Sequence, residues 1–230
     1  MRRWLSTLVL PGIAVAFIGC SAAAPAATED GARPLYTEEE IDYFLDVAFG
    51  SEFSNSFPRI RKWSRAVKVR VAGKPTDADR AMIQQVIDDL NALDGVVEVG
   101  LDARDSNVEI HFAPEREFSR IDPNYVPVNL GFFWAKWDRS GKIYQARILI
   151  TTEGVTQKER SHLIREELTQ ILGLMRDSGR YPQSIFYQHW TDVTRYTDLD
   201  KTAIEILYCP EIRANMTESQ ARRVLNNLSG

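Results

Sequence analysis

The chain has 230 residues, of which 44% are hydrophobic, a composition that suits a globular protein with a sizeable core. It carries 28 basic and 32 acidic residues, a formal charge of −4. Removal of Arg2 and Arg3 with a cleaved leader would leave 26 basic and 32 acidic residues, a formal charge near −6. This balance argues against a nucleic-acid partner, which normally requires a basic surface. After the leader, no run reaches the roughly 18 apolar residues of a membrane span.

The first 19 residues have the pattern of a secretory leader. Arg2 and Arg3 form a basic start, residues 4–18 form an apolar stretch, and Gly19-Cys20 ends it. A small residue followed by cysteine at this place resembles a bacterial lipobox, which implies cleavage before Cys20 and lipidation of its sulfur. The alternatives are a plain signal peptide and an uncleaved anchor.

Residues 20–34 are rich in Ala, Pro, Thr and Gly, which predicts a flexible tether between the lipid and the folded domain. The lipobox resemblance implies a bacterial envelope protein that faces the periplasm and is held to the membrane through Cys20. Ser21 and Ala22 supply no acidic residue for inner-membrane retention, so the outer membrane is favoured. Cys209 is the one thiol left, and we expect it to be buried and unreactive.

From residue 35 to 230 the pattern predicts one mixed α/β domain. Five predicted helices each begin at a threonine cap: Thr37, Thr76, Thr156, Thr197 and Thr217. At Thr37, Thr156 and Thr217 a Glu or Gln follows three residues later, which is the pattern of a capping box. Predicted strands cover 66–72, 96–99 and 107–112, followed by a hairpin over 131–137 and 143–152. Strands that alternate with helices in this way predict a mainly parallel sheet.

The helix over 156–174 is the most informative segment. Ile164, Leu168, Ile171 and Leu172 form an apolar stripe at helical spacing, which predicts a face packed on the core. His162, Glu166 and Gln170 lie four residues apart and form a polar row on another face.

This helix resembles the active-site helix of a metzincin, whose motif is H-E-x-x-H-x-x-G-x-x-H. In that motif three histidines bind Zn²⁺, the glutamate is the general base, and the glycine allows a sharp turn. Here the three histidine positions hold other residues, Glu166, Gln170 and Arg176. Glu167 holds the place of the general base and Gly173 that of the turn.

The residues that follow extend the resemblance. Ser184-Ile185-Phe186-Tyr187 is similar to a metzincin Met-turn, with Phe186 in place of methionine, and 198–208 is similar to the C-terminal helix. The order of the upstream elements is also that of a metzincin catalytic domain. The resemblance therefore implies a zincin-like α/β fold with a degenerate metal site.

Several blocks resemble more closely a bacterial family of secreted or lipid-anchored proteins, domain of unknown function 2927. The blocks are FLDVAFGSEF from Phe44, residues 60–63, GFFWAKWD, REELTQILGL and SIFYQ, and they span most of residues 36–208. The resemblance to this family implies a zincin-like fold of unassigned activity. It supplies no catalytic residues that could be assigned to this chain.

We expect no cofactor, and zinc in particular is disfavoured. Glu166 suits a metal, but the amide of Gln170 is a poor ligand and Arg176 opposes a cation. We therefore expect Arg176 to form an ion pair with Glu166, and Gln170 to bridge the two by hydrogen bonds.

Two residues of the helix keep alternative interpretations. His162 could be a ligand or proton carrier, but we favour a histidine on the polar side of the helix, satisfied by Glu166 or Glu159. Glu167 is either a general base or a helix-face carboxylate that pairs with Arg160 or Arg165.

The strand over 131–137 has two interpretations as well. Zincin substrates usually align along an edge strand above the active-site helix, so Phe133, Trp134 and Trp137 could line a binding groove. Alternatively these aromatic side chains pack in the core under the helix.

The function favoured by these features is that of an envelope lipoprotein that binds a protein, peptide or envelope component in the cleft where a metzincin would hold its metal, or acts as an envelope scaffold, without catalysis. The alternative is a metallopeptidase-like hydrolase that uses Glu167 as general base with non-standard metal ligands.

Overall fold

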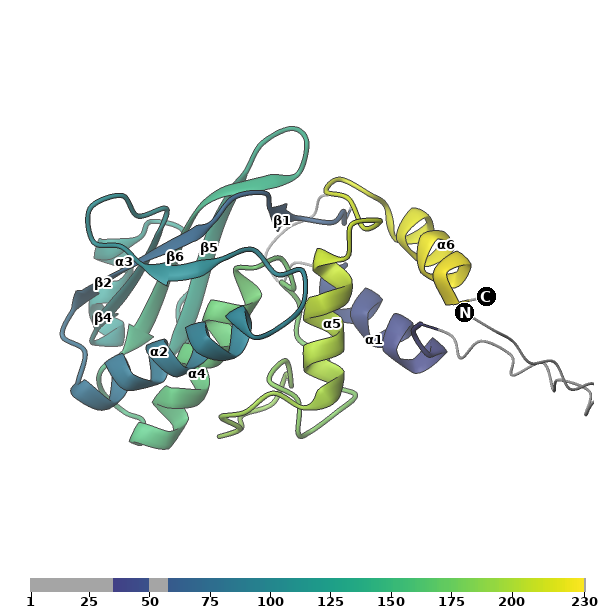
Figure 1. The fold of residues 1–230 in the computed structure, drawn as a ribbon. Coiled ribbons are helices and arrows are strands. Elements are labelled where there is room, and N and C mark those ends of the chain that lie inside the picture. The colour runs from purple at the N-terminus through teal and green to yellow at the C-terminus, as the bar shows by residue number, and fades with distance from the viewer. Residues whose placement is uncertain (1–34, 50–57, 230) are drawn as a thin grey trace, which may run out of the picture. The chain divides into compact units, whose positions relative to one another are not determined.

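The computed structural model describes residues 35–49 and 58–229, so the predicted leader, the tether and Cys20 lie outside the described residues. The domain is built on a six-stranded sheet with helices packed against it (Figure 1). The strands are β1 (Lys62–Trp63), β2 (Val67–Gly73), β3 (Val99–Leu101), β4 (Val108–Ala113), β5 (Gly131–Trp137) and β6 (Lys142–Thr151). The helices are α1 (Glu38–Ala48), α2 (Asp77–Asn91), α3 (Phe118–Ile121), α4 (Gln157–Gln170), α5 (Asp198–Tyr208) and α6 (Glu218–Ser229).

The sheet is mainly parallel, which confirms the predicted class. Strand β6 pairs in parallel with both β4 and the short β1, and β2 pairs in parallel with β3 and β4. Strand β5 is the exception, because it returns antiparallel to β6 through the hairpin and forms the edge of the sheet. The hairpin turn is closed by Asp138, whose Oδ1 accepts hydrogen bonds from the backbone N–H groups of Ser140 and Lys142.

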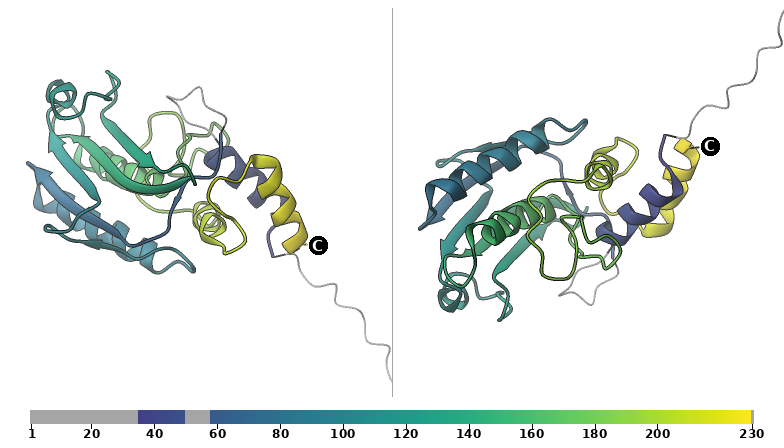
Figure 2. Two further views of the ribbon diagram at one scale, coloured as in Figure 1. Left: turned by 90° about the horizontal axis from the view of Figure 1, so that it is seen from above. Right: turned by 90° about the horizontal axis from the view of Figure 1, so that it is seen from below.

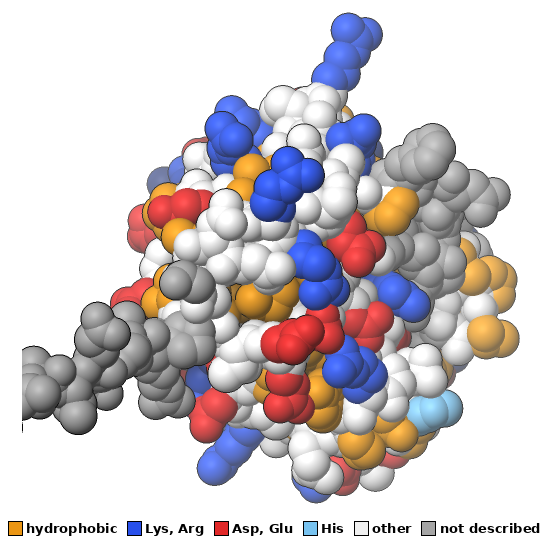
Figure 3. All heavy atoms as spheres, turned by 90° about the vertical axis from the view of Figure 1, so that its right-hand side faces the viewer, with side chains coloured by type: hydrophobic (Ala, Val, Ile, Leu, Met, Phe, Trp, Pro, Cys, Tyr) orange, Lys and Arg blue, Asp and Glu red, His pale blue; other side chains and the backbone are white. Residues whose placement is uncertain are grey.

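Helices α2 and α4 lie side by side over one face of the sheet (Figure 2). Their apolar stripes meet the inward-facing side chains of the strands, and Ile83, Ile110, Ile148 and Ile164 are all fully buried there. Helix α1 packs against α5 and α6 beyond the sheet. On the face over α1 and α6, acidic and basic side chains are interspersed rather than gathered by sign (Figure 3). None of the helices that the structure describes is long and apolar enough to cross a membrane.

All five predicted threonine caps are present, and each of them is a capping box, with Asp79 and Asp200 completing the boxes at Thr76 and Thr197. Each threonine side chain accepts the backbone N–H of the residue three positions later, and that residue's side chain accepts the threonine N–H, at Thr37, Thr76, Thr156, Thr197 and Thr217. These contacts satisfy backbone donors that the first helical turn leaves unpaired, so they fix where each helix begins. The short α3, absent from the prediction, follows a 3₁₀ turn in the loop between β4 and β5.

The strand predicted over 96–99 is wrong in its bounds. The side chain of Asn91, at the end of α2, binds both the N–H and the carbonyl of Val99, so the ladder begins at Val99 and runs to Leu101. Cys209 is buried, as expected, and its Sγ donates to Oε2 of Glu211 at 2.8 Å.

The end of α4 depends on a close approach between two chain segments. The helix ends at Gln170 and the chain turns at Gly173, which has φ of +128°. A Cβ at this position would collide with the backbone carbonyl oxygen of Arg61, next to β1. Glycine is therefore required twice at this turn, for its backbone conformation and for space.

A buried carboxylate then connects the segments that follow. Asp200 is fully buried and accepts hydrogen bonds from the Ser184 hydroxyl at 2.6 Å, the Thr197 N–H at 2.9 Å and the Ile185 N–H at 3.3 Å. The Tyr43 hydroxyl of α1 contacts both Ser184 and Asp200. One side chain thus holds the start of α5, the Ser184–Tyr187 turn and α1 together.

We predict that Asp200→Ala lowers the free energy of unfolding by about 2–4 kcal/mol, because several buried donors lose their acceptor at once. Asp198→Ala is the matched control, since Asp198 lies in the same helical turn but its side chain is 100% exposed. Its cost should stay within about 1 kcal/mol. Denaturant unfolding of both variants measures the difference, and equal losses would contradict the role given to Asp200.

Candidate functional site

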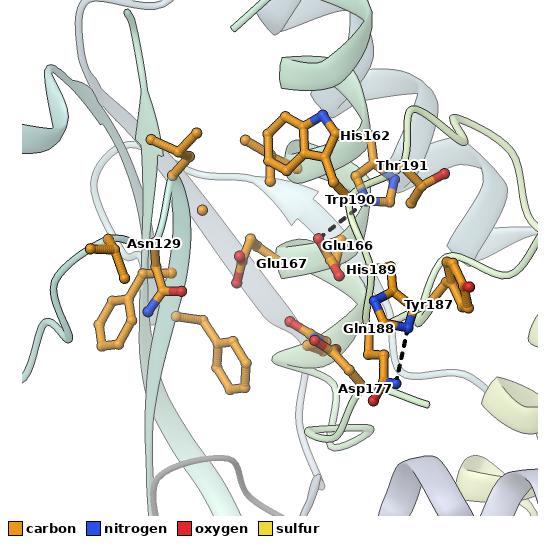
Figure 4. Close-up of a pocket in the computed structure, with 17 residues that line it drawn as sticks. Asn129, His162, Glu166, Glu167, Asp177, Tyr187, Gln188, His189, Trp190 and Thr191 are labelled. Carbon is orange, nitrogen blue, oxygen red and sulfur yellow. Dashed lines mark hydrogen bonds and ion pairs between the residues drawn. The ribbon is translucent and has the colours of Figure 1, made fainter. Parts of the chain in front are cut away.

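A pocket of about 300 Å³ lies between the start of β5, helix α4 and the segment 187–191 (Figure 4). The segment leading into β5 supplies one wall, the polar side of α4 supplies the floor, and residues 187–191 supply the opposite wall. The lining residues are Val128, Asn129, Leu130, Gly131, Phe132, Phe133, His162, Leu163, Glu166, Glu167, Gln170, Asp177, Tyr187, Gln188, His189, Trp190 and Thr191. Two of the large apolar residues exposed on the surface, Val128 at 88% and Trp190 at 57%, are on its border.

The polar row predicted on α4 faces this pocket. His162, Glu166 and Gln170 are four residues apart, so they project from the same side of the helix, and Glu167 lies beside them. The helix is buried on this side as well as on its apolar side, since His162 is 3% exposed and Glu167 and Gln170 are each 5% exposed. Buried polar side chains need hydrogen-bond partners. In this row, most of those partners are groups on neighbouring segments at short distances.

His162 is held at both ring nitrogens. Nδ1 lies 2.7 Å from the carbonyl oxygen of Val193, which can only accept, so Nδ1 carries a proton. Nε2 lies 3.3 Å from Oε2 of Glu166. Glu166 is thus one of the two partners expected for His162, but the pair is buried in the pocket rather than exposed on the helix surface.

The environment of His162 favours its charged form. Burial opposes the charge, but the hydrogen bond and the attraction of Glu166, with the Val193 carbonyl, outweigh it and raise the pKa of His162 above its ordinary value. The Glu166 carboxylate, 3.3 Å from Nε2, is thus the group that most favours the imidazolium form of His162.

Glu167 points into the pocket in the close-up (Figure 4). Neither arginine expected as its partner pairs with it, because Arg160 contacts Asp79 at 3.0 Å and Arg165 contacts Asp89 at 2.6 Å. Gly131 of β5 lies directly opposite, and a Cβ there would come within 2.5 Å of Glu167 Oε1. The missing side chain at Gly131 makes room for this carboxylate.

The predicted Arg176–Glu166 network is wrong. Arg176 lies outside the pocket lining, half-exposed, and its guanidinium pairs with Asp46 of α1 at 3.2 Å. Gln170 instead donates to Oδ1 of Asp177 at 2.6 Å. The turn at Gly173 carries the chain toward α1, and this direction takes Arg176 away from Glu166.

The aromatic groove is only partly as predicted. Phe133 lines the pocket, but Trp134 points to the other face of the sheet, where it packs on the small cluster around Phe118 and Phe132. Trp137 packs against the main core, with the Arg61 guanidinium 5.0 Å from its ring centre. Alternation along a strand explains this outcome, since Phe133 and Trp134 are neighbours and must face opposite ways.

The Ser184–Tyr187 turn lies under the far wall of the pocket. Phe186 is fully buried, and its backbone carbonyl accepts a hydrogen bond from the Ser178 N–H at 2.7 Å. An isolated parallel β-bridge pairs Ser178 with Tyr187. Tyr187 then lines the pocket, next to His189, whose ring lies edge-on at 5.1 Å. His189, Trp190 and Asp177 are pocket residues that sequence reasoning missed, because they lie in loops without a periodic pattern.

The side chains present do not form a metal site of the usual kind. Over residues 35–49 and 58–229, no three His, Cys, Asp or Glu side chains come together in a way that could hold a metal ion. Glu166 is already engaged by His162, and the amide of Gln170 by Asp177. The donor set therefore fits zinc poorly.

Two comparisons with known proteins bear on this site. Residues 37–227 match the family model described as "Protein of unknown function (DUF2927)", over more than half of the chain. No curated protein matches the sequence.

We predict that NMR titration gives His162 a pKa above 6.5 and that Glu166→Gln lowers it, because the variant removes the negative partner. A raised folded-state pKa stabilises the fold below the unfolded value and ceases to do so as pH rises through the folded value. The free energy of unfolding of the native chain should therefore decline over that window more than that of Glu166→Gln.

Glu159→Gln is the control, because glutamine retains the capping box at Thr156. It should leave the His162 titration unchanged. An unshifted pKa in Glu166→Gln would show that the ion pair is not what holds the proton.

Proposed function

Because the chain belongs to the DUF2927 family, whose description assigns no activity, we propose a function from the site itself: the domain binds an extended peptide segment along β5, without cleaving it. The outer edge of β5 beside the pocket, with which no other strand of residues 35–49 and 58–229 pairs, is the observation that carries this proposal. We further propose that the domain is zincin-like and that Cys20 anchors it by lipid in the bacterial envelope, toward the periplasm and at the outer membrane.

The zincin-like assignment is supported by the order of the elements. Strand β2, helix α2, strands β3 and β4, the β5–β6 hairpin and α4 follow one another as expected for a metzincin catalytic domain. The pocket lies on the side of α4 that would carry the metal ligands, and the Ser184–Tyr187 turn lies beneath it.

The hydrogen bonds between β5 and β6 show which backbone groups of β5 face outward. The Thr151 N–H donates to the Leu130 carbonyl at 2.9 Å, so residue 130 and every second residue after it face β6. Gly131, Phe133 and Ala135 therefore direct their N–H and carbonyl groups to the outer edge. Among the described residues no other strand pairs with this edge.

An unpaired strand edge is a template for another extended chain. A peptide that added to β5 would make main-chain hydrogen bonds with Gly131 and Phe133, both of which line the pocket. Its alternate side chains would then enter the pocket over α4. Backbone pairing would supply affinity, and the pocket would supply specificity.

A second candidate is supported by Glu167. A buried carboxylate that faces a pocket beside an edge strand is suited to act as a general base, and the pocket is open enough to admit a substrate. This candidate requires a metal held by non-standard ligands, and Glu166 and His162 would then have to release one another.

We predict that peptides selected from a randomised heptapeptide display bind the full chain and that Phe133→Ala weakens them about tenfold, since an aromatic wall of the site is lost. Trp134→Ala is the matched control, one residue along the same strand but on the opposite face. It should change the dissociation constant less than about twofold, as measured by fluorescence anisotropy. Failure to select any peptide, or equal losses in the two variants, would contradict the proposal.

Catalysis can be measured separately. We predict that a quenched-fluorescence peptide library, with and without added Zn²⁺, shows equal turnover for the native chain and for Glu167→Gln. A general base would contribute on the order of 100-fold or more. A loss of that size in Glu167→Gln would establish the hydrolase instead of the binding protein.

A further inference from the structure

We infer that a second pocket, on the face of the sheet away from α4, binds a saccharide that carries an acidic substituent. The second pocket has a volume of about 280 Å³ and lies over strands β2, β4, β6 and β5, with residues 122–124 as one wall. No described residue lines both this pocket and the pocket over α4. The inference therefore goes beyond the proposed peptide binding and does not depend on it.

The register of the sheet brings the charged and aromatic side chains of the second pocket into one row. Glu109 of β4 lies between its ladder partners Arg70 of β2 and Arg147 of β6. Trp134 of β5 is the partner of Arg147 on the other side. Partner residues project from the same face of a sheet, so the whole row faces away from α4 together with Trp134. Four strands of the sheet thus position this row.

The covered part of the same face holds the aromatic ring in place. Phe118 of α3 and Tyr125 pack over Phe132, and the ring centres of Tyr125 and Phe132 are 5.5 Å apart. Trp134, two residues further along β5, packs against this cluster and also lines the second pocket. It is only partly buried, so a ring that the fold positions keeps accessible surface for a ligand.

The carboxylates of the second pocket are already paired within the protein. Glu109 contacts the guanidinium of Arg70, and its Oε1 lies 3.3 Å from Nε of Arg147. Nη1 of Arg147 lies 3.2 Å from Oδ2 of Asp122. Lys136 is the third cationic side chain of the lining, and none of the described carboxylates forms an ion pair with it. Three cationic and two acidic side chains thus line the pocket, and the excess positive charge lies at Lys136.

Lys136 is within reach of a ligand that stacks on Trp134. The two residues are two positions apart on the same face of β5, and Gln145 is the partner of Lys136 on β6. Such a separation along a strand is about 7 Å, close to the span of one sugar ring with its substituent. A carboxylate or phosphate on that ring would supply the counter-charge that Lys136 lacks.

One aromatic ring surrounded by polar side chains favours a saccharide over other organic ligands. Trp134 is the single aromatic residue among the described residues that line the second pocket. A sugar ring has a face of C–H groups that packs on one aromatic ring, and hydroxyl groups at its edge that need donors and acceptors. The Gln145 amide offers both kinds of group. A flat aromatic ligand would gain more from rings on both of its faces.

The test applies the full chain, labelled with a fluorophore, to an array of glycans. The array pairs neutral glycans with glycans of the same backbone that bear a uronic acid, a sialic acid or a phosphate. We expect the acidic glycans to be retained. Calorimetry on the strongest acidic glycan and its neutral counterpart should give dissociation constants at least about fivefold apart, and the ratio should fall at high salt because the attraction is electrostatic.

A first variant tests the aromatic ring. Trp134→Leu keeps an apolar side chain against the cluster around Phe118 but removes the ring, so it should weaken binding of the acidic glycan about tenfold. Tyr144→Leu is the matched control, because Tyr144 is an aromatic residue of β6 that is 44% exposed and lies outside the second pocket. It should leave the dissociation constant nearly unchanged.

A second variant tests the charge and replaces the first should Trp134→Leu fail to fold. Lys136→Gln should bring the affinities for the acidic and neutral glycans to within about twofold of each other, because the excess positive charge is lost. Lys142→Gln is its control, an exposed lysine of β6 outside the second pocket, and it should retain the full preference. Circular dichroism verifies that each variant is folded.

Every other outcome counts against the inference. An array that retains no glycan, or equal losses in Trp134→Leu and Tyr144→Leu, would overturn it. Equal binding of acidic and neutral glycans would overturn it as well, since Lys136 would then have no role. A short oligothymidylate that binds with the same loss in Trp134→Leu would overturn it in favour of a nucleic acid. Peptide binding at β5 is measured separately with Phe133→Ala, so the two proposals can fail independently.

Discussion

The buried carboxylate of Asp200 is the contact on which the site depends. It completes the capping box of α5, accepts the hydroxyl of Ser184 and lies against the Tyr43 hydroxyl of α1, so three distant segments meet at one side chain. The Ser184–Tyr187 turn gains its position from this contact, and residues 187–191 continue from the turn as the far wall of the pocket. The contact therefore connects the start of α5 to the wall that faces the polar row of α4.

Helix α4 is buried on two sides, and this explains its unusual composition. One side packs Ile164 and Leu168 into the core, as an ordinary amphipathic helix does. The other side buries His162, Glu167 and Gln170 under loops. Burying such groups is costly unless they are hydrogen-bonded, and a well-packed apolar side would stabilise the fold at least as well. The proposed recognition role would account for polar groups at that cost around a pocket.

Much of the fold follows from local sequence. The threonine capping boxes, the alternation in Val67–Gly73 and the turn chemistry of Asp138 to Gly141 act over a few residues, so they could be predicted without knowing the tertiary structure. The site could be predicted only in part. Position along the helix placed His162 and Glu166 on one face, but nothing local shows that the chain after Gly173 carries Arg176 toward Asp46. The loop residues Asp177 and His189 are placed beside the pocket by contacts between segments distant in sequence, such as those of Ser178 and Asp200.

In the proposed complex, strand β5 would supply backbone hydrogen bonds and helix α4 would supply side-chain contacts. Alternation along β5 sends Phe133 to the pocket and Trp134 to the opposite face, while the same alternation turns the polar backbone groups of Gly131 and Phe133 to the free edge. A strand edge alone would pair with any extended chain. Because Gly131 lies both on this edge and directly opposite Glu167, a peptide bound as proposed would meet the strand edge and the pocket together.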